Sequence, residues 1–375
     1  MTLHYVVMPV LILLAGILIA CLSVRRIFSL RTKTLSTLRK TAERVVLCLV
    51  ALVTLLLVAS SGINAVAFAR FRHAPGGAIY QVYGHAMRID CMGSGSPTIV
   101  LDSGLGNDGL IWGGVQPVLA KTTRVCSYDR AGYGWSDAVA TPRDADHIAM
   151  DLHGLLRAAG IDNPVVLMGH SIAGIYIRGY ATRYPTGVAG LIFVDGSTPL
   201  QEKDPAFEAH AHMTRPGLLR VLLVKAAFSA GIPRWFGQCS HPPDWLDRRA
   251  AHLMVEDRCY MGIDESLGES GNMGRSGDET VHTGPYGALP ILIFSSDEAK
   301  QRAEKMPGDV LDAWNRMQQN LLTLSTRSRR IIAKGSGHYV QLDRPDLIER
   351  EVPVFLEQIR GAESAPTSYQ STVTE

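Results

Sequence analysis

Residues 165–174 read VVLMGHSIAG and are the most informative segment for the fold of the chain. The apolar run predicts a buried strand, and the small residues after it allow a sharp turn into a helix that runs to about Tyr184. Ser171 stands at that turn, where its hydroxyl would be lifted above the end of the sheet beside the first amides of the helix. The usual form of such a turn is G-x-S-x-G, whereas here Ala173 takes the place of the second glycine and Gly174 follows it. We predict that Ser171 is a nucleophile.

A second segment supplies a base for that serine. Residues 334–345 read KGSGHYVQLDRP, so His338 lies on a glycine-containing loop after a late strand. A serine hydroxyl needs a neighbouring base to take its proton, and His338 is the candidate. The acid that orients the histidine follows a strand in two places. Asp297 is the preferred candidate and Asp195 is the alternative, because the chain order Ser, Asp, His holds for either.

A third segment, TIVLDSGLG at residues 98–106, predicts a strand that ends in a glycine-rich loop. Backbone N–H groups that stabilise a negatively charged oxygen are expected at two places. One is Ile172, directly after the nucleophile, and the other is Leu105 in this loop.

Strands and helices alternate through the body of the chain, which predicts a mostly parallel, doubly wound α/β sheet. The expected strands are Ile79–Tyr83 and Met87–Cys91 (a hairpin), Thr98–Asp102, Arg124–Tyr128, Pro164–Met168, Leu191–Val194, Pro290–Phe294 and Arg330–Ala333. Besides the helix after Ser171, helices are expected from Thr141 as N-cap to Ala159, over Asp312–Leu324 and over Pro345–Ile359.

Three boundaries follow from composition. Residues 198–287 break the alternation and are interpreted as a helical cap, with helices over Leu218–Ser229 and Asp244–Asp257. The body as a whole is expected to cover residues 73–360. Residues 361–375 are polar and rich in Ser and Thr, and they are expected to be a disordered tail.

The first 72 residues are expected to form a membrane anchor. Residues 5–24 and 45–69 carry no charge, and each run is long enough to span the roughly 30 Å hydrocarbon core as a helix. The intervening residues 25–44 hold seven bases and one acid. Because basic loops stay cytoplasmic, this pattern predicts a two-pass anchor with the body on the outer, extracytoplasmic or periplasmic side. Membrane lipid is therefore an expected partner.

The charge balance excludes other classes of function. The first 72 residues hold nine Lys or Arg and one acid while the whole chain is only +2, so the body is net acidic. Nucleic-acid binding requires a basic face and is not expected. No metal-ligand spacing and no phosphate-binding or dinucleotide motif is present, so neither a metal nor a cofactor is predicted. Nothing in the sequence indicates protein partners.

The combined motifs resemble the α/β-hydrolase fold family over roughly residues 78–360. The resemblance is carried by TIVLDSGLG, by CSYDRAGYGWS at 126–136, by GHSIAG and by SGHYVQLDRP, in that order. It implies the roles of nucleophile for Ser171, base for His338 and acid for Asp297. The sequence departs from the family at Ala173 and at Ser103, which replaces a histidine often found before the glycine of the oxyanion loop.

The resemblance also implies that Cys91 and Cys126 lie on adjacent strands, and that Cys239 and Cys259 both lie in the cap. Both pairs are predicted to be disulfides if the body is extracytoplasmic. The expected function is a membrane-anchored serine hydrolase, esterase- or lipase-like, that cleaves a small or lipid-like acyl substrate. The alternatives are a peptidase or acyltransferase using the same three residues, and a non-catalytic, membrane-tethered binding domain.

Overall fold

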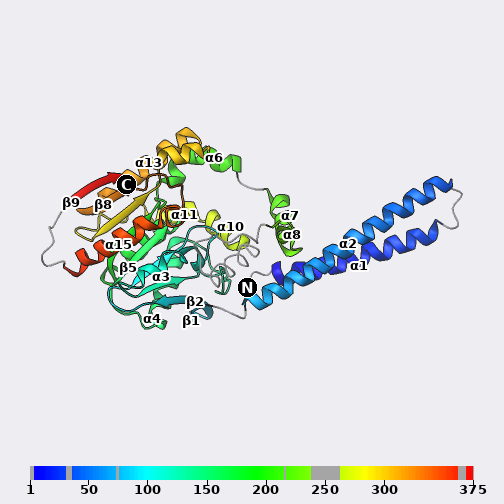
Figure 1. Cartoon of the computed structure of the whole chain (residues 1–375), viewed down its shortest axis with the longest axis horizontal. Helices are drawn as coiled ribbons and strands as arrows, with labels where there is room; N and C mark the ends of the chain where they lie inside the picture. The colour runs from blue at the N-terminus through cyan, green and yellow to red at the C-terminus, as the bar shows by residue number, and fades with distance from the viewer. Residues whose placement is uncertain are drawn as a thin grey trace.

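The computed structural model describes residues 4–30, 36–72, 76–214, 217–237, 262–361 and 369–374. Two long helices extend from one side of an α/β body, as Figure 1 shows. Within the described ranges the strands form one sheet of nine, in the order β1-β2-β4-β3-β5-β6-β7-β8-β9. Strands β1 and β2 pair antiparallel with each other and β2 with β4, and the remaining pairs are parallel. The predicted mostly parallel α/β-hydrolase sheet is confirmed.

The elements agree closely with the sequence pattern. The strands are β1 Ala78–Val82, β2 His85–Met92, β3 Ile99–Asp102, β4 Val125–Tyr128, β5 Val165–His170, β6 Val188–Val194, β7 Ile291–Ser295, β8 Arg327–Ile332 and β9 Tyr369–Thr374. The helices of the body are α3 Gln116–Leu119, α4 Ala145–Ala158, α5 Ala173–Arg183, α12 Glu298–Ala303, α13 Gly308–Asn320, α14 Val340–Asp343 and α15 Pro345–Arg360. Short 3-10 helices cover Gly109–Trp112, Pro185–Gly187, Gln201–Lys203 and Leu321–Leu324.

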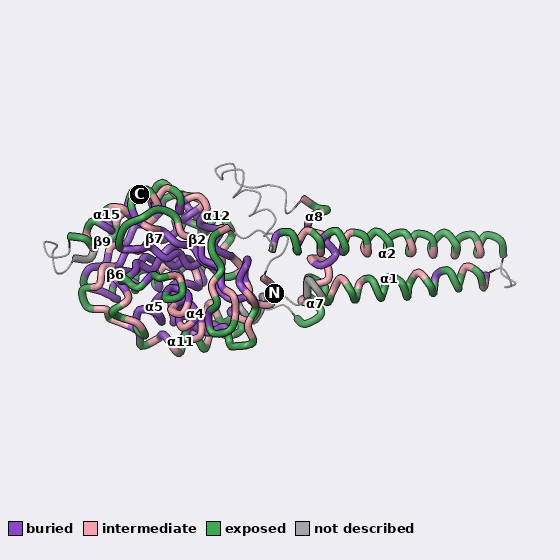
Figure 2. Tube along the Cα trace, turned by 90° about the horizontal axis from the view of Figure 1, so that it is seen from below, coloured by how far each residue is buried: buried purple, intermediate pink, exposed green. Residues whose placement is uncertain are grey.

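Helices cover both faces of the sheet, and the central strands are therefore buried on both sides. One core packs α4 and α5 against the strands, with Leu152, Leu155 and Ile177 among its buried side chains. The other core packs α15 and the segment around Trp112 against the opposite face. Figure 2 shows this buried interior inside an exposed shell, and the long helices lie outside it.

One sequence expectation about the start of a helix is corrected. Helix α4 begins after Asp144, whose side chain accepts the His147 N–H, and not at Thr141. An Asp at the N-cap satisfies one of the amides that the first turn leaves unpaired, and here it takes precedence over the proline two residues upstream.

The tail also differs from its expected disorder. Residues 369–374 form β9, which pairs in parallel with β8 along six residues. Without β9, strand β8 would be an edge with unpaired N–H and C=O groups. The Tyr, Thr and Val residues of the tail favour extended backbone, so they are suited to pair with that edge.

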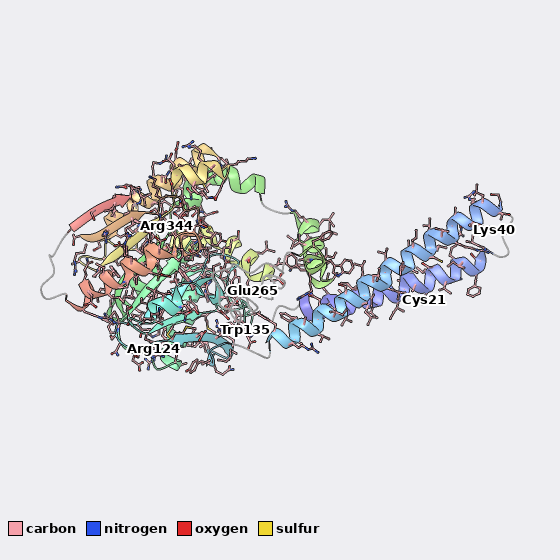
Figure 3. All side chains as sticks on the ribbon, viewed as in Figure 1. Cys21, Lys40, Arg124, Trp135, Glu265 and Arg344 are labelled. Carbon is pink, nitrogen blue, oxygen red and sulfur yellow. A yellow bond between two sulfur atoms is a disulfide. The ribbon has the colours of Figure 1, made fainter. Side chains whose placement is uncertain are left out.

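The N-terminal helices α1 His4–Ser29 and α2 Thr37–Arg72 form an antiparallel hairpin. Both are long and apolar enough to cross a membrane. They extend beyond the predicted runs into the basic segment, and Lys40 lies near the tip farthest from the body in Figure 3. Gly16 lets them approach closely, because a Cβ there would lie 2.6 Å from a Val58 methyl.

The base of α2 is fixed to the body through Trp135. The indole Nε1 donates a 2.7 Å hydrogen bond to the Phe71 carbonyl, and the ring stacks on Phe71 with centroids 4.4 Å apart. The N-terminal helical hairpin therefore has a defined contact with the body.

The described cap residues form five helices: α6 Pro205–Thr214, α7 Leu218–Ser229, α8 Ile232–Trp235, α10 Ile263–Gly271 and α11 Met273–Thr280. Helix α7 has the predicted bounds. The predicted helix over 244–257 and the predicted Cys239–Cys259 disulfide lie outside the described residues.

Cys91 and Cys126 form a disulfide between directly opposed positions of β2 and β4. This pairing agrees with the prediction. We expect a Cys91→Ala/Cys126→Ala variant to lose about 2–4 kcal/mol of unfolding free energy, because the disulfide restricts the unfolded chain. Urea unfolding checks this, with Cys21→Ala/Cys48→Ala as the control, since those two cysteines are free and exposed. Equal midpoints for the two variants would contradict the prediction.

Candidate active site

Ser171 lies between β5 and α5 in a left-handed backbone conformation, with φ of +55°. This conformation costs a non-glycine residue about 1–3 kcal/mol and persists only where the surroundings fix it. Here the Ser171 N–H donates to the Val194 carbonyl at 3.2 Å, and the Ser171 carbonyl accepts from the Ser197 N–H at 2.7 Å. The turn is thus fixed to the end of β6.

The glycines around Ser171 explain why the motif tolerates Ala173. A Cβ on Gly169 would lie 2.9 Å from the Ala173 carbonyl, and one on Gly174 would lie 2.7 Å from the Ser197 carbonyl. The close approach of helix α5 to the loop after β6 therefore occurs at Gly174. The Ala173 methyl instead packs in a buried cluster with Ile148.

His338 bridges Ser171 and Asp195. Its Nε2 lies 2.9 Å from the Ser171 Oγ, and its Nδ1 lies 2.7 Å from Asp195 Oδ2. The Asp195 side chain is fully buried, and that of His338 is one-third exposed. The imidazole is therefore partly accessible to solvent, while the carboxylate is screened from water.

Four other donors hold the Asp195 carboxylate. Its Oδ1 accepts from the Ser296 N–H and Oγ–H, both at 2.9 Å, and from Trp314 Nε1 at 3.2 Å, and Gln301 Nε2 approaches Oδ2 at 3.5 Å. Burial alone would raise the pKa of this carboxyl. The hydrogen bond and charge of His338 together with the Ser296 donors outweigh burial and hold the pKa below its usual value.

Asp297, the preferred acid from the sequence, does not contact His338, and this expectation is corrected. Asp297 is the N-cap of α12, where Oδ1 accepts the Ala299 N–H at 3.0 Å. Its Oδ2 accepts the Gly335 N–H at 2.8 Å, so it supports the loop that leads to the histidine. Asp195 is closer to the nucleophile because β6 is hydrogen-bonded to β5 along its length.

The loop after β3 lies against the serine turn. A Cβ on Gly104 would lie 2.7 Å from His170 Nδ1 and 3.2 Å from the Ser171 Cβ. In the described ranges, neither the Leu105 nor the Ile172 amide donates to a protein acceptor. Ser103 has a local role, since its Oγ donates to the Asp108 carbonyl at 2.7 Å.

Comparison with known proteins identifies the family. The model of the alpha/beta hydrolase family matches residues 99–351. This chain belongs to the alpha/beta hydrolase family. Membership supports an enzyme of the hydrolase type, and the expected resemblance is confirmed.

Individual relatives of this chain have varied names. It is 38% identical over 292 residues to a probable transporter, efuK, of Hormonema carpetanum. That match covers 73% of this chain and 41% of the relative. It is 31% identical over 284 residues to a putative carbamate hydrolase, RutD, of Pantoea ananatis, which covers 73% of this chain and 92% of that one. The chain spans 42% of the length of an uncharacterized protein, C23C11.06c, of Schizosaccharomyces pombe and thus less than half of two relatives.

Among solved structures, epoxide hydrolase A from Mycobacterium thermoresistibile is similar with a TM-score of 0.56. The match covers 76% of this chain and 98% of that structure, at 21% sequence identity. At this identity the likeness shows the hydrolase fold alone.

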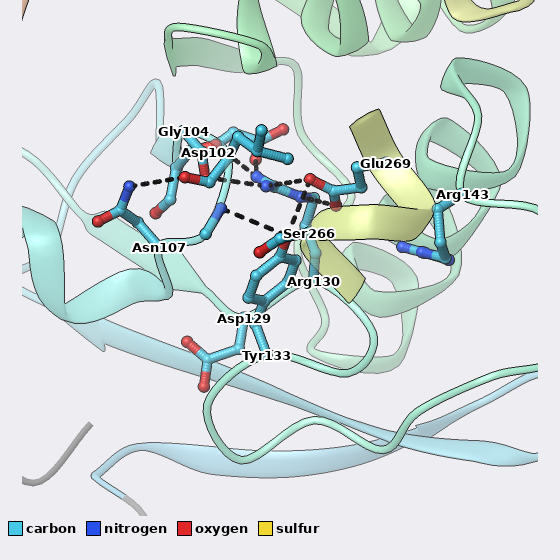
Figure 4. Close-up of polar contacts among 12 residues, drawn as sticks. Asp102, Gly104, Asn107, Asp129, Arg130, Tyr133, Arg143, Ser266 and Glu269 are labelled. Carbon is cyan, nitrogen blue, oxygen red and sulfur yellow. Dashed lines mark hydrogen bonds and ion pairs between the residues drawn. The ribbon is translucent and has the colours of Figure 1, made fainter. Parts of the chain in front are cut away.

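The body also contains a buried ionic cluster around Arg130, which sequence reasoning missed (Figure 4). The Arg130 guanidinium donates to both carboxylate oxygens of Glu269, at 2.7 and 2.8 Å, and to Asp102 Oδ1 at 2.7 Å. It also donates to the carbonyls of Ser103 and Gly104, the latter at 3.1 Å. Burial would lower the pKa of this guanidinium, but Glu269 and Asp102 outweigh burial and raise it.

This cluster connects the cap to the loop after β3. Glu269 belongs to cap helix α10, and Arg130 follows β4. Tyr133 adds to the connection, because its hydroxyl lies 3.4 Å from the Gly106 nitrogen and 3.2 Å from Glu269 Oε2. The segment CSYDRAGYGWS contains Arg130, but its partner Glu269 lies 139 residues away in the chain. The sequence therefore gave no local sign that the two residues pair.

His170, next to the nucleophile in sequence, supports the His338 loop. It is fully buried, and its Nε2 lies 3.0 Å from the His338 carbonyl oxygen. Burial, followed by the nearby charge of His338, lowers the pKa of His170 to about 3. The ring is therefore neutral and donates its Nε2–H to that carbonyl.

This shift predicts a pH dependence of stability. Between pH 6.5 and 3 the unfolded state binds a proton at His170 that the folded state does not bind. The free energy of unfolding therefore decreases as the pH is lowered, by up to about 1.4 kcal/mol per pH unit. A His170→Gln variant keeps an N–H donor without titrating, and its slope should be shallower. Urea titrations between pH 4 and 7 measure this, with exposed His282→Gln as the control. Equal slopes for His170→Gln and the wild type would contradict the prediction.

Among the described residues, no group of His, Cys, Asp and Glu side chains is arranged to hold a metal ion. The chemistry available at this place is that of a serine, a histidine and a buried carboxylate.

Proposed function

We propose that this protein is a membrane-anchored serine hydrolase that cleaves a carboxylic ester through an acyl-enzyme. The proposal rests above all on the bridge that His338 makes between Ser171 and Asp195. In this proposal Ser171 is the nucleophile, His338 the general base and then acid, and Asp195 the orienting carboxylate.

The proposed chemistry follows from the hydrogen bonds. Asp195 is ionised and accepts Nδ1–H, so Nε2 of the neutral imidazole is free to take the Ser171 proton. The Oγ then attacks the ester carbonyl, and the histidine passes the proton to the departing alcohol. Water deprotonated by the same Nε2 hydrolyses the acyl-serine and restores the enzyme.

Stabilisation of the oxyanion is assigned to the Leu105 and Ile172 amides. In a trans peptide the C=O and the following N–H point in opposite directions. Arg130 binds the Gly104 carbonyl, and the Leu105 N–H of the same peptide is therefore directed away from Arg130. The Ile172 amide is at the N-terminus of α5, where the helix favours negative charge.

The proposed serine nucleophile favours an ester over an epoxide, the substrate class named for the structural neighbour. A hydroxyl nucleophile with a base forms an acyl-enzyme from an ester, a thioester or an amide. Epoxide opening in this fold uses a carboxylate at the position of Ser171. The proposed substrate is therefore a small or lipid-like acyl compound.

The membrane arrangement is part of the proposal. Helices α1 and α2 cross the bilayer, with the basic residues near their tip in the cytoplasm and the body outside. The Cys91–Cys126 disulfide supports this side of the membrane, because structural disulfides persist in oxidising compartments.

A fluorophosphonate probe tests the activated serine. Full-length protein in detergent should be labelled covalently, and the Ser171→Ala variant should not. Exposed Ser270→Ala serves as the matched control and should be labelled like the wild type. Absence of labelling in folded wild type would contradict the proposal. Labelling with amide cleavage faster than ester cleavage would favour the peptidase alternative.

A further inference from the structure

The cap helices α7 and α8 lie against the N-terminal hairpin and not over the body (Figures 1 and 2). They belong to the cap by sequence, between α6 and α10. The segment 217–237 that contains them holds three bases, Arg220, Lys225 and Arg234, and no acid. We call residues 217–237 the cap hairpin.

Three polar side chains of α2 donate hydrogen bonds to backbone carbonyls at the C-terminal end of α7. The Ser60 hydroxyl donates to the Ala230 carbonyl at 2.6 Å, the Ser61 hydroxyl to the Ser229 carbonyl at 3.1 Å, and the Asn64 amide to the Phe228 carbonyl at 2.9 Å. The Ser229 and Ala230 carbonyls lie past the point where the helix supplies a backbone donor, whereas the Phe228 carbonyl also accepts the Gly231 N–H at 3.0 Å. In hydrocarbon such groups must be satisfied by protein, and these three are.

The backbone at Gly231 makes the contact close. Gly231 has φ of +72°, and a Cβ there would lie 3.1 Å from the Ser60 Oγ and 3.3 Å from the Asn64 Cβ. Ser61 and Asn64 are each at least 98% buried under the cap hairpin. The contact is therefore a built joint between the cap and α2.

The opposite surface of the cap hairpin is apolar and exposed. Four leucines of α7 and two aromatic residues at the end of α8 are 49–79% exposed: Leu218, Leu219, Leu222, Leu223, Trp235 and Phe236. Helices α1 and α2, against which the cap hairpin lies, also carry exposed apolar side chains, and Leu14, Leu18 and Leu56 are more than half exposed. Large exposed apolar patches on a protein mark a surface that binds a partner.

The joint lies at membrane depth. Ser60 to Asn64 stand five to nine residues before Ala69, where the uncharged run of α2 ends. At 1.5 Å per residue this is roughly 8–14 Å inside that end, within one leaflet of a core roughly 30 Å thick.

We propose that the cap hairpin binds the acyl chains of the bilayer leaflet next to the body and holds the cap at the lipid surface. The proposal rests on the membrane anchor of the proposed function and adds an element to it. Lys225 on α7 pairs with Asp264 on α10, the helix whose Glu269 binds Arg130. The lipid-bound hairpin is thereby connected to the loop that carries Leu105, and substrate is taken from the membrane.

Photo-crosslinking in vesicles tests the contact. A benzophenone amino acid replaces Leu219 in the full-length protein, reconstituted in mixed phosphatidylcholine and phosphatidylglycerol vesicles. Irradiation should add the mass of one phospholipid to the protein. The same probe at Leu56 of α2 should also capture lipid, and at exposed Val354 of α15 it should not.

The outcomes distinguish lipid binding by the cap hairpin from membrane anchoring by α1 and α2. Lipid capture at Leu56 without capture at Leu219 overturns the inference and keeps the anchor. Absence of capture at both positions overturns both. Crosslinking of Leu219 to a second copy of the chain would show that the surface is a dimer interface, which also overturns the inference.

Kinetics test the consequence. A Leu219→Asp/Leu223→Asp variant should raise KM for a long-chain ester dispersed in the same vesicles by at least about tenfold, because two apolar contacts with lipid are lost. Hydrolysis of a soluble short-chain ester should stay within about twofold of wild type, since the hairpin lies away from Ser171. The control Val354→Asp should change neither. Equal losses on both esters would overturn the inference.

Discussion

An Asp195→Asn variant is expected to lose about four orders of magnitude in kcat on a soluble ester. The reason is the tautomer of His338. Three donors surround Asp195 Oδ1, from Ser296 and Trp314, so the amide oxygen of the new Asn must occupy that position. Its NH₂ then faces His338 Nδ1 and donates to it. The imidazole must carry its proton on Nε2, where it can no longer accept one from Ser171.

Asp297→Asn is the matched comparison, since both aspartates follow a strand and precede the histidine in the chain. Asn caps a helix about as well as Asp, so its amide oxygen should keep the Ala299 N–H and α12 should persist, while the Gly335 N–H loses its acceptor. We expect kcat to fall by less than about tenfold, because the change leaves the three reacting groups in place. Circular dichroism and initial rates on purified variants decide between the two acids. A larger loss at Asp297 than at Asp195 would reject the assignment.

An Arg130→Met variant is expected to lose about 3–5 kcal/mol of unfolding free energy. Removing the guanidinium leaves the Glu269 and Asp102 carboxylates buried without a countercharge. Burial, the largest influence, already raises the pKa of Asp102 above its usual value even with Arg130 beside it. The measurement is the urea midpoint with its slope.

Arg302→Met is the control, because the Arg302–Glu298 pair is more than half exposed and such pairs contribute about 0–1 kcal/mol. Arg130 is a positioning residue in this account, so kcat should fall with little change in KM where the variant is folded. An Arg130→Met/Glu269→Leu variant should recover part of the stability, because one unpaired charge is removed as well. A midpoint for Arg130→Met equal to that of Arg302→Met would contradict the cluster's role.

Sequence reasoning favoured Asp297, whereas the carboxylate that contacts His338 is Asp195. Asp195 and Asp297 both follow an apolar strand, and both stand between Ser171 and His338 in the chain. The one local difference is that Asp297 precedes Glu298 and a helix, a pattern typical of an N-cap. Which carboxylate meets the histidine depends on the neighbouring strands, and those are set by the order of β5, β6, β7 and β8 in the sheet.

Features that depend on neighbours along the chain could be predicted from the amino-acid sequence. Apolar runs, turn glycines and helix caps located the strands, the turn at Ser171, the loop of His338 and the two long apolar helices, because each is a property of a few consecutive residues. Only the tertiary structure decided the partners. It joined His338 to Asp195, Arg130 to Glu269, β9 to β8 and the cap hairpin to α2. These contacts join residues between about 40 and 170 positions apart, and their geometry is fixed by packing and by the need to pair buried polar groups.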